Sequence, residues 1–228
     1  MIPWELIDSA QVPGNKGVLR LYRRGEEYSI RTAGVELMNS RVHGSEEALA
    51  EFACTKIASR TRPYILVGGL GMGYTMAAAL KMLGASGRIV VAELVPKVVD
   101  WNRGPLEGLN GHALRDDRVR VVHADVCKIL QKEIQAFDAI LLDVDNGPGS
   151  VISSGNDWLY CGDGLDAAFT ALRPEGVLAV WSAGRDRAFV WRLHQAGFAV
   201  DEVNVRARGR SKGRRNTIWL ATRKPSRK

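Results

Sequence analysis

From Tyr64 onward, short apolar runs alternate with stretches of helical periodicity, and this alternation constrains the fold more than any other feature of the sequence. The apolar runs, which predict strands, cover Tyr64–Val67, Ile89–Ala92, Val119–Val122, Ala139–Leu142 and Val177–Trp181. The stretches that predict helices are Tyr74–Leu83, Pro96–Trp101, Val126–Ile134, Gly164–Leu172 and Asp186–Ala196. Continuous apolar strands separated by helices are typical of a parallel sheet covered on both faces. We therefore predict an α/β fold that is doubly wound and mostly parallel.

The two ends of the chain depart from this pattern. Phe198–Arg206 and Thr217–Thr222 predict two strands joined as an antiparallel hairpin at the C-terminal edge of the sheet. Alternating apolar and polar positions over Val18–Tyr22 and Glu27–Thr32 predict a small antiparallel hairpin or meander. We therefore divide the chain into a small N-terminal β unit, residues 1–44, and an α/β domain, residues 45–228, whose first helix we expect Ser45 to cap.

Length and composition limit the class of protein. A chain of 228 residues fits one domain, and its longest apolar runs are far too short to span a bilayer. The first residues lack a basic start followed by an apolar segment, so we expect no signal peptide and no membrane attachment. Cys54, Cys127 and Cys161 are widely spaced and form no metal-binding pair. We therefore expect free thiols in a reducing cytoplasm and no bound metal.

The net charge of +7 is concentrated in one segment, because Arg206–Arg215 reads RARGRSKGRR and holds six of the 32 lysines and arginines. A basic loop of this kind can bind nucleic acid through the phosphates. The segment has no interleaved aromatic side chains on which bases could stack, which favours a solvated loop instead.

A glycine-rich stretch, LVGGLGMGY, follows the first predicted parallel strand and directly precedes a predicted helix. Its glycines at 69, 71 and 73 allow a sharp turn and a close approach of the backbone to a ligand. The stretch does not have the GxGxxG spacing of the nicotinamide dinucleotide sites, because Tyr74 stands where that pattern requires glycine.

Three acidic residues follow the next strands in order, and this strengthens the interpretation of a ligand site. Glu93 ends the second parallel strand, where a carboxylate can accept hydrogen bonds from two ribose hydroxyls. Asp125 follows the third strand and can accept from an adenine amino group, or it can cap the helix that it precedes. Asp143 ends the fourth strand at the same carboxyl edge of the sheet, where open α/β sheets bind ligands.

With these motifs, the sequence resembles the class I S-adenosylmethionine-dependent methyltransferase fold, with a seven-stranded, Rossmann-like sheet. Within that fold it resembles the spermidine synthases, which are polyamine aminopropyltransferases. The resemblance rests on Arg41–Glu47, the glycine loop, Glu93, Asp125 and the segment FDAILLDVDNGP. It implies polyamine biosynthesis, with S-adenosylmethionine or its decarboxylated form as the donor, and it implies that Asp143 deprotonates the amine that attacks the donor.

The chemistry of the residues agrees with an amine substrate. An alkyl amine is mostly protonated at pH 7, so a carboxylate first attracts the cation and then accepts its proton. Asp143 and Asp145 suit this catalytic task, with Asn146 as an orienting partner. Tyr160 and Trp181 are candidate walls of a pocket for a cationic substrate. The N-terminal β unit also offers a surface through which two copies would form a homodimer.

Two alternatives remain open, because the glycine loop departs from the family. Gly71 stands where spermidine synthases usually carry an acid that holds the donor's aminopropyl amine. The loss of that acid makes room for the carboxylate of the intact donor, which leads to the first alternative, a methyltransferase acting on a small amine or on RNA. The second alternative is a protein that binds a nucleoside without catalysing a reaction.

Overall fold

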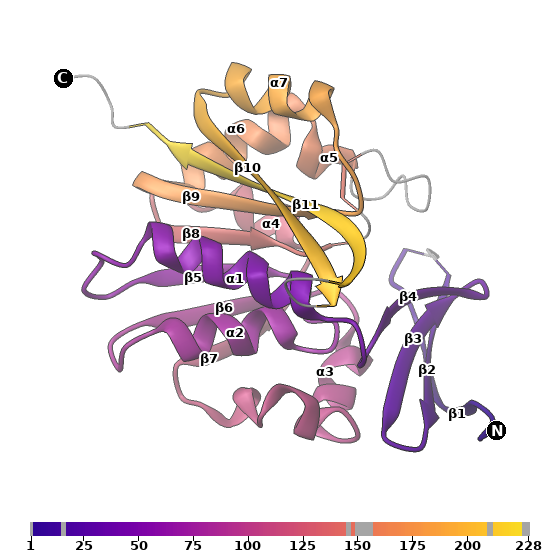
Figure 1. Ribbon diagram of the computed structural model, residues 1–228. Helices are drawn as coiled ribbons and strands as arrows, with labels where there is room; N and C mark the ends of the chain where they lie inside the picture. Colours follow the sequence, from indigo (N-terminus) through magenta and orange to yellow (C-terminus); the bar gives the residue numbers. More distant parts are fainter. Residues whose placement is uncertain (1, 15–16, 145–146, 149–156, 209–211, 225–228) are drawn as a thin grey trace.

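The computed structural model describes residues 2–14, 17–144, 147–148, 157–208 and 212–224, which form two sheets (Figure 1). The larger sheet has the strand order β10-β11-β9-β8-β5-β6-β7. Neighbouring strands from β9 to β7 run parallel, whereas β11 runs antiparallel to both β9 and β10. The strand bounds are β5 (Tyr64–Gly68), β6 (Arg88–Glu93), β7 (Val119–His123), β8 (Phe137–Leu142), β9 (Leu172–Ser182), β10 (Phe198–Arg208) and β11 (Lys212–Arg223). The predicted doubly wound, mostly parallel fold with a C-terminal antiparallel hairpin is confirmed.

Helices cover both faces of this sheet. One face carries α1 (Gly44–Lys56), α2 (Tyr74–Met82) and α3 (Pro96–Arg103), and the other carries α4 (Val126–Leu130), α6 (Gly162–Ala171) and α7 (Arg187–Gln195). Short helical turns lie at α5 (Asp157–Tyr160), η1 (Glu107–Asn110) and η2 (Ala113–Arg115). In β5, Ile65 and Val67 pack toward the first set of helices and Leu66 toward the second, because successive side chains point to opposite faces.

Two local predictions need correction. The first helix begins at Gly44, so Ser45 lies inside it and does not cap it; its hydroxyl donates to the Glu46 carboxylate at 2.7 Å. The helix predicted to reach Ile134 ends at Leu130, because the chain must turn back before β8. That turn places Gln135 in the left-handed region, where its backbone N–H donates to the Thr170 carbonyl at 2.8 Å.

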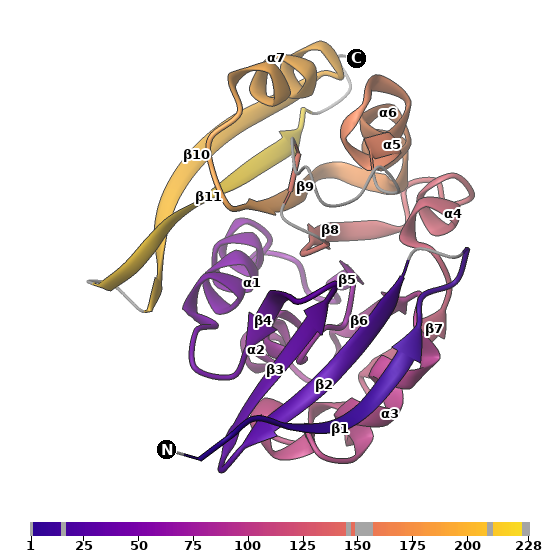
Figure 2. The same ribbon diagram turned by 90° about the vertical axis from the view of Figure 1, so that its right-hand side faces the viewer.

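The smaller sheet is antiparallel and consists of β1 (Glu5–Gln11), β2 (Val18–Arg24), β3 (Glu27–Thr32) and β4 (Val35–Asn39) in sequence order. It lies beside the carboxyl ends of the parallel strands (Figures 1 and 2). Leu21 and Ile30 are buried in the same core cluster as α1 and α2, and the Trp101 indole N–H of α3 donates to Asp8 of β1 at 3.0 Å. The edge of the large sheet where parallel strands commonly bind ligands therefore faces the small sheet.

No helix in the described part of the chain is long and apolar enough to cross a membrane. The basic segment predicted as a loop lies mostly in strands, because residues 206–208 end β10 and residues 212–215 begin β11, where Arg215 pairs with Arg206. Residues 209–211 lie outside the described ranges.

Candidate active site

The glycine loop turns sharply between β5 and α2. Gly69, Gly71 and Gly73 have φ values of +83°, +52° and +83°, which only glycine adopts at little cost. A Cβ on Gly73 would lie 2.9 Å from the side chains of Asn102 and Asn110. The Asn102 amide also donates to the Gly71 carbonyl at 2.7 Å. The asparagine side chains therefore support the loop on one side, and its glycines at 69 and 71 line a cavity on the other.

Glu93, at the end of β6, fixes the backbone around this loop. One carboxylate oxygen accepts from the Leu70 N–H and the other from the Val95 N–H, both at 2.8 Å. The residue is only 7% exposed. Burial raises the pKa of its carboxyl group, while the backbone hydrogen bonds oppose that rise. Glu93 lines the cavity, and its role toward ribose hydroxyls stays a prediction.

Asp125 lies after β7 at the start of α4. Its side chain accepts from the Cys127 N–H at 2.9 Å, so the capping role that the sequence left open is present. Asp125 also lines the same cavity as Glu93. Capping occupies one carboxylate oxygen of Asp125. That the other oxygen accepts a hydrogen bond from an adenine amino group stays a prediction.

Asp143 follows β8 and is half-buried. The Thr75 hydroxyl of α2 donates to its carboxylate at 2.7 Å. Burial raises the pKa of Asp143, and the hydrogen bond from Thr75 lowers it in part by favouring the charged form. Asp143 lines two cavities.

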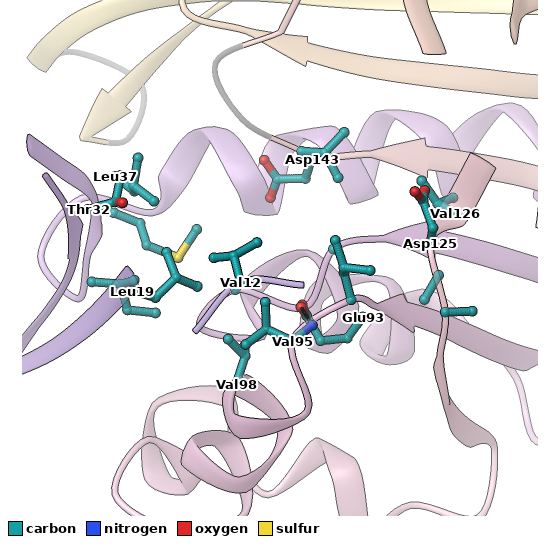
Figure 3. A pocket seen from close by; sticks show the side chains of 18 residues that line it. Val12, Leu19, Thr32, Leu37, Glu93, Val95, Val98, Asp125, Val126 and Asp143 are labelled. Atoms are coloured by element: carbon teal, nitrogen blue, oxygen red, sulfur yellow. Dashed lines mark hydrogen bonds between the residues drawn. The ribbon is translucent and has the colours of Figure 1, made fainter. Parts of the chain in front are cut away.

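The first cavity, of about 240 Å³, lies between the glycine loop and the small sheet (Figure 3). Figure 3 shows Leu19, Thr32 and Leu37 on the left of the view and Asp125 on the right, with Glu93 and Asp143 between them. The charged residues among the described lining are Glu93, Asp125 and Asp143. The cavity therefore combines apolar walls with three carboxylates, which suits a ligand that has an apolar body, hydroxyl or amino donors and a positive charge.

The second cavity, of about 200 Å³, lies beyond Leu37 and Met38, which also line the first. Its described charged residues are Glu36, Glu46 and Asp143. Burial raises the pKa of Glu46 to about 7, and the negative charge of Asp143 adds to this rise.

Sequence reasoning did not find Glu46 as a site residue. Its position in the first turn of a helix is an ordinary place for an acid. One feature of the sequence could have indicated this role. Glu46 lies at the junction between the small sheet and the α/β domain, where the first turn of a helix can face the ligand-binding edge of the large sheet.

The remaining predicted site residues lie in different places. Trp181 lines the second cavity. Tyr160 is buried among the helices of the opposite face, where its hydroxyl donates to the Val144 carbonyl at 3.1 Å and its ring meets the edge of Phe189. It is not among the described residues that line either cavity. Asp145 and Asn146 lie outside the described residues, so their catalytic and orienting roles stay predictions.

The strand order, with one reversed strand next to the edge and a glycine loop after β5, defines the Rossmann-like methyltransferase fold. Within this class the structure is similar to a spermidine synthase solved in complex with the transition state analogue AdoDATO. The TM-score is 0.75 at 17% identity, over 97% of this chain and 73% of that one. Spermidine synthase from Thermotoga maritima gives the same TM-score and identity, over 97% and 74% of the two chains.

The sequence comparison leads to the same group. Over 149 residues the chain is 27% identical to polyamine aminopropyltransferase 1 of Streptomyces coelicolor, an alignment that covers 62% of this chain. The chain spans only 27% of the length of that relative. No family model matches the sequence. The resemblance to the spermidine synthases that the sequence indicated is therefore confirmed, in local sequence similarity and in fold.

Proposed function

We propose that this protein is an aminopropyltransferase, which transfers the aminopropyl group of decarboxylated S-adenosylmethionine to an amine. The observation that carries this proposal is the sign of the charges around the two cavities. Their described charged residues are all carboxylates, five in number: Glu36, Glu46, Glu93, Asp125 and Asp143. The decarboxylated donor has a sulfonium and an ammonium group, and the acceptor is an alkyl ammonium ion. Both substrates are cations, and such a site attracts cations.

The same charges disfavour methyl transfer from the intact donor, which carries one more carboxylate. No lysine, arginine or histidine is among the described residues that line either cavity, so this carboxylate would have no basic side chain to pair with. The space beside Gly71 is not free either, because a Cβ there would lie 2.7 Å from the Met38 methyl carbon. The similarity to a polyamine aminopropyltransferase gives independent support.

In the proposed complex, the first cavity holds the donor and the second holds the acceptor. The adenosine part lies between the apolar walls, with Glu93 and Asp125 toward its hydroxyl and amino groups. Asp143 lines both cavities, so the bond between nitrogen and carbon forms beside its carboxylate. The carbon–sulfur bond breaks in the same step, and the sulfonium leaves as a neutral thioether. Alignment of the two substrates supplies much of the rate acceleration.

Donor preference tests the proposal directly. We expect calorimetric titration to give at least about tenfold tighter binding of the decarboxylated donor than of S-adenosylmethionine, a difference of about 1.4 kcal/mol. Mass spectrometry of reactions with diamines should then show products enlarged by one aminopropyl group. Asp143→Asn should remove product formation. Tighter binding of the intact donor, or methylated products, would refute the proposal.

A further inference from the structure

Glu46 is an acid of the second cavity that the resemblance to spermidine synthases does not account for. It lies in the first turn of α1, and Asp143 follows β8, yet both line the same cavity. Thr75 connects the two segments. Its hydroxyl oxygen lies 2.7 Å from the Asp143 carboxylate and 3.4 Å from the Glu46 backbone carbonyl. Both acids therefore line the cavity in which the acceptor amine would react.

Glu46 has no basic partner among the described residues. The one side-chain hydrogen bond described for its carboxylate comes from the hydroxyl of its neighbour Ser45, at 2.7 Å. The carboxylate of Glu47, the next residue in the helix, lies 3.3 Å from Nδ1 of His43. A mostly buried carboxylate without a cation is costly, and it is commonly retained where a ligand supplies the charge or the proton.

We infer that Glu46 is a catalytic residue of the proposed aminopropyl transfer and accepts the proton of the acceptor amine, while Asp143 keeps its negative charge beside the donor. The inference rests on the proposed function. The division of roles follows from the partners of the two acids. Burial raises the pKa of both carboxyl groups. The hydrogen bond from Thr75 offsets part of that rise for Asp143, whereas the charge of Asp143 adds to it for Glu46.

The proton and electron balance is complete without another reactant. The acceptor ammonium gives one proton to Glu46 and becomes a neutral amine. Its lone pair forms the bond to the carbon next to sulfur, and the electrons of the carbon–sulfur bond go to sulfur, which leaves as a neutral thioether. The positive charge of the sulfonium thereby passes to the new secondary ammonium of the product, and Glu46 releases its proton to solvent before the next turnover.

The surroundings of Glu46 place its titration near neutral pH. The described titratable groups around it include Asp143, Glu47 on its own helix, Tyr74 of α2 and Glu36 of β4. His43, which precedes the helix, stacks on Tyr74 and lies beside Glu47, and Glu36 lies 3.9 Å from Arg31. Burial raises the pKa of Tyr74 to about 12, so this group stays neutral. With a pKa of about 7, Glu46 is half charged at neutral pH, which suits a general base.

The test compares Glu46→Gln with Glu47→Gln, a matched control one residue along the same helix, and with Glu46→Asp, which retains a carboxyl group. Putrescine and other diamines serve as acceptors. We expect Glu46→Gln to lower kcat at pH 7 by at least about 100-fold. We expect the donor Kd, measured by calorimetry, to change less than threefold. Glu47→Gln should keep wild-type kcat, and Glu46→Asp should retain a measurable part of it.

The pH profile separates proton transfer from a structural role. The deficit of Glu46→Gln should shrink as the pH approaches the pKa of the free amine, about 10.4, because the acceptor then arrives already neutral. A kcat for Glu46→Gln within threefold of wild type, or a deficit that does not change with pH, would overturn the inference while leaving the proposed function in place. Wild-type protein that binds neither donor and forms no product would instead overturn both.

Discussion

Glu46→Gln should make the ligand-free protein more stable, although it removes the proposed proton acceptor. Glu46 is mostly buried, and burial together with the charge of Asp143 raises its pKa from 4.5 to about 7. The folded protein therefore holds a proton that the unfolded chain has already released between these two values. The contribution of Glu46 to stability is therefore largest below pH 4.5, falls as the pH rises toward 7, and levels off above it. Glutamine has nearly the same shape and does not titrate, so the variant lacks this loss.

The magnitude follows from the same pKa change. A tenfold change in the affinity for a proton is worth about 1.4 kcal/mol, so a rise from 4.5 to about 7 corresponds to about 3 kcal/mol at pH 8. For a chain of 228 residues this is on the order of 10 °C in Tm.

Urea and thermal unfolding at pH 5 and pH 8 measure this difference. We expect the variant and the wild type to differ little at pH 5 and by about 3 kcal/mol at pH 8, with the variant more stable. Glu47→Gln should show no such pH-dependent gain, because that side chain is partly exposed and lies beside His43. Equal stability of wild type and Glu46→Gln at pH 8 would refute the account of a buried, unpaired acid.

Two further predictions concern the loop and its neighbours. Thr75→Val should weaken binding of the decarboxylated donor about tenfold and shift the pH dependence of binding to higher pH, because loss of the 2.7 Å hydrogen bond raises the pKa of Asp143 further. Thr75→Ser should restore the affinity and its pH dependence. Calorimetric titration of the donor at several pH values measures these differences. Gly73→Ala should lower the free energy of unfolding in urea by at least about 1 kcal/mol more than Gly111→Ala. Both positions have positive φ, but a Cβ meets Asn102 at 2.9 Å only at the first. Equal losses would contradict the assigned role of the asparagine.

The sheet could be predicted because its signal is local. Buried parallel strands need apolar residues at consecutive positions, and these runs stand out in the sequence. The edge of the sheet that carries the site could be predicted by the same reasoning, since the carboxyl ends of parallel strands meet on one side. Glu93, Asp125 and Asp143 were therefore predicted to lie together, and all three line one cavity.

The rest depended on contacts between distant segments. Met38 belongs to the small sheet, and no local pattern indicates that its side chain covers Gly71. Glu46 has the sequence context of an ordinary helix start, and the packing of α1 against α2 and β8 brings it toward Asp143. The two hydrogen bonds of Glu93 to backbone N–H groups depend on the path of two loops, which residue types alone do not determine.

Leu37 and Met38 of β4 line both cavities, so one pair of side chains is a wall for two ligands. A donor that shifts this wall changes the free energy with which the acceptor binds. Reciprocity then requires the acceptor to change the affinity for the donor by the same factor. The two substrates are therefore expected to bind cooperatively through β4, although neither needs to touch the other before they react.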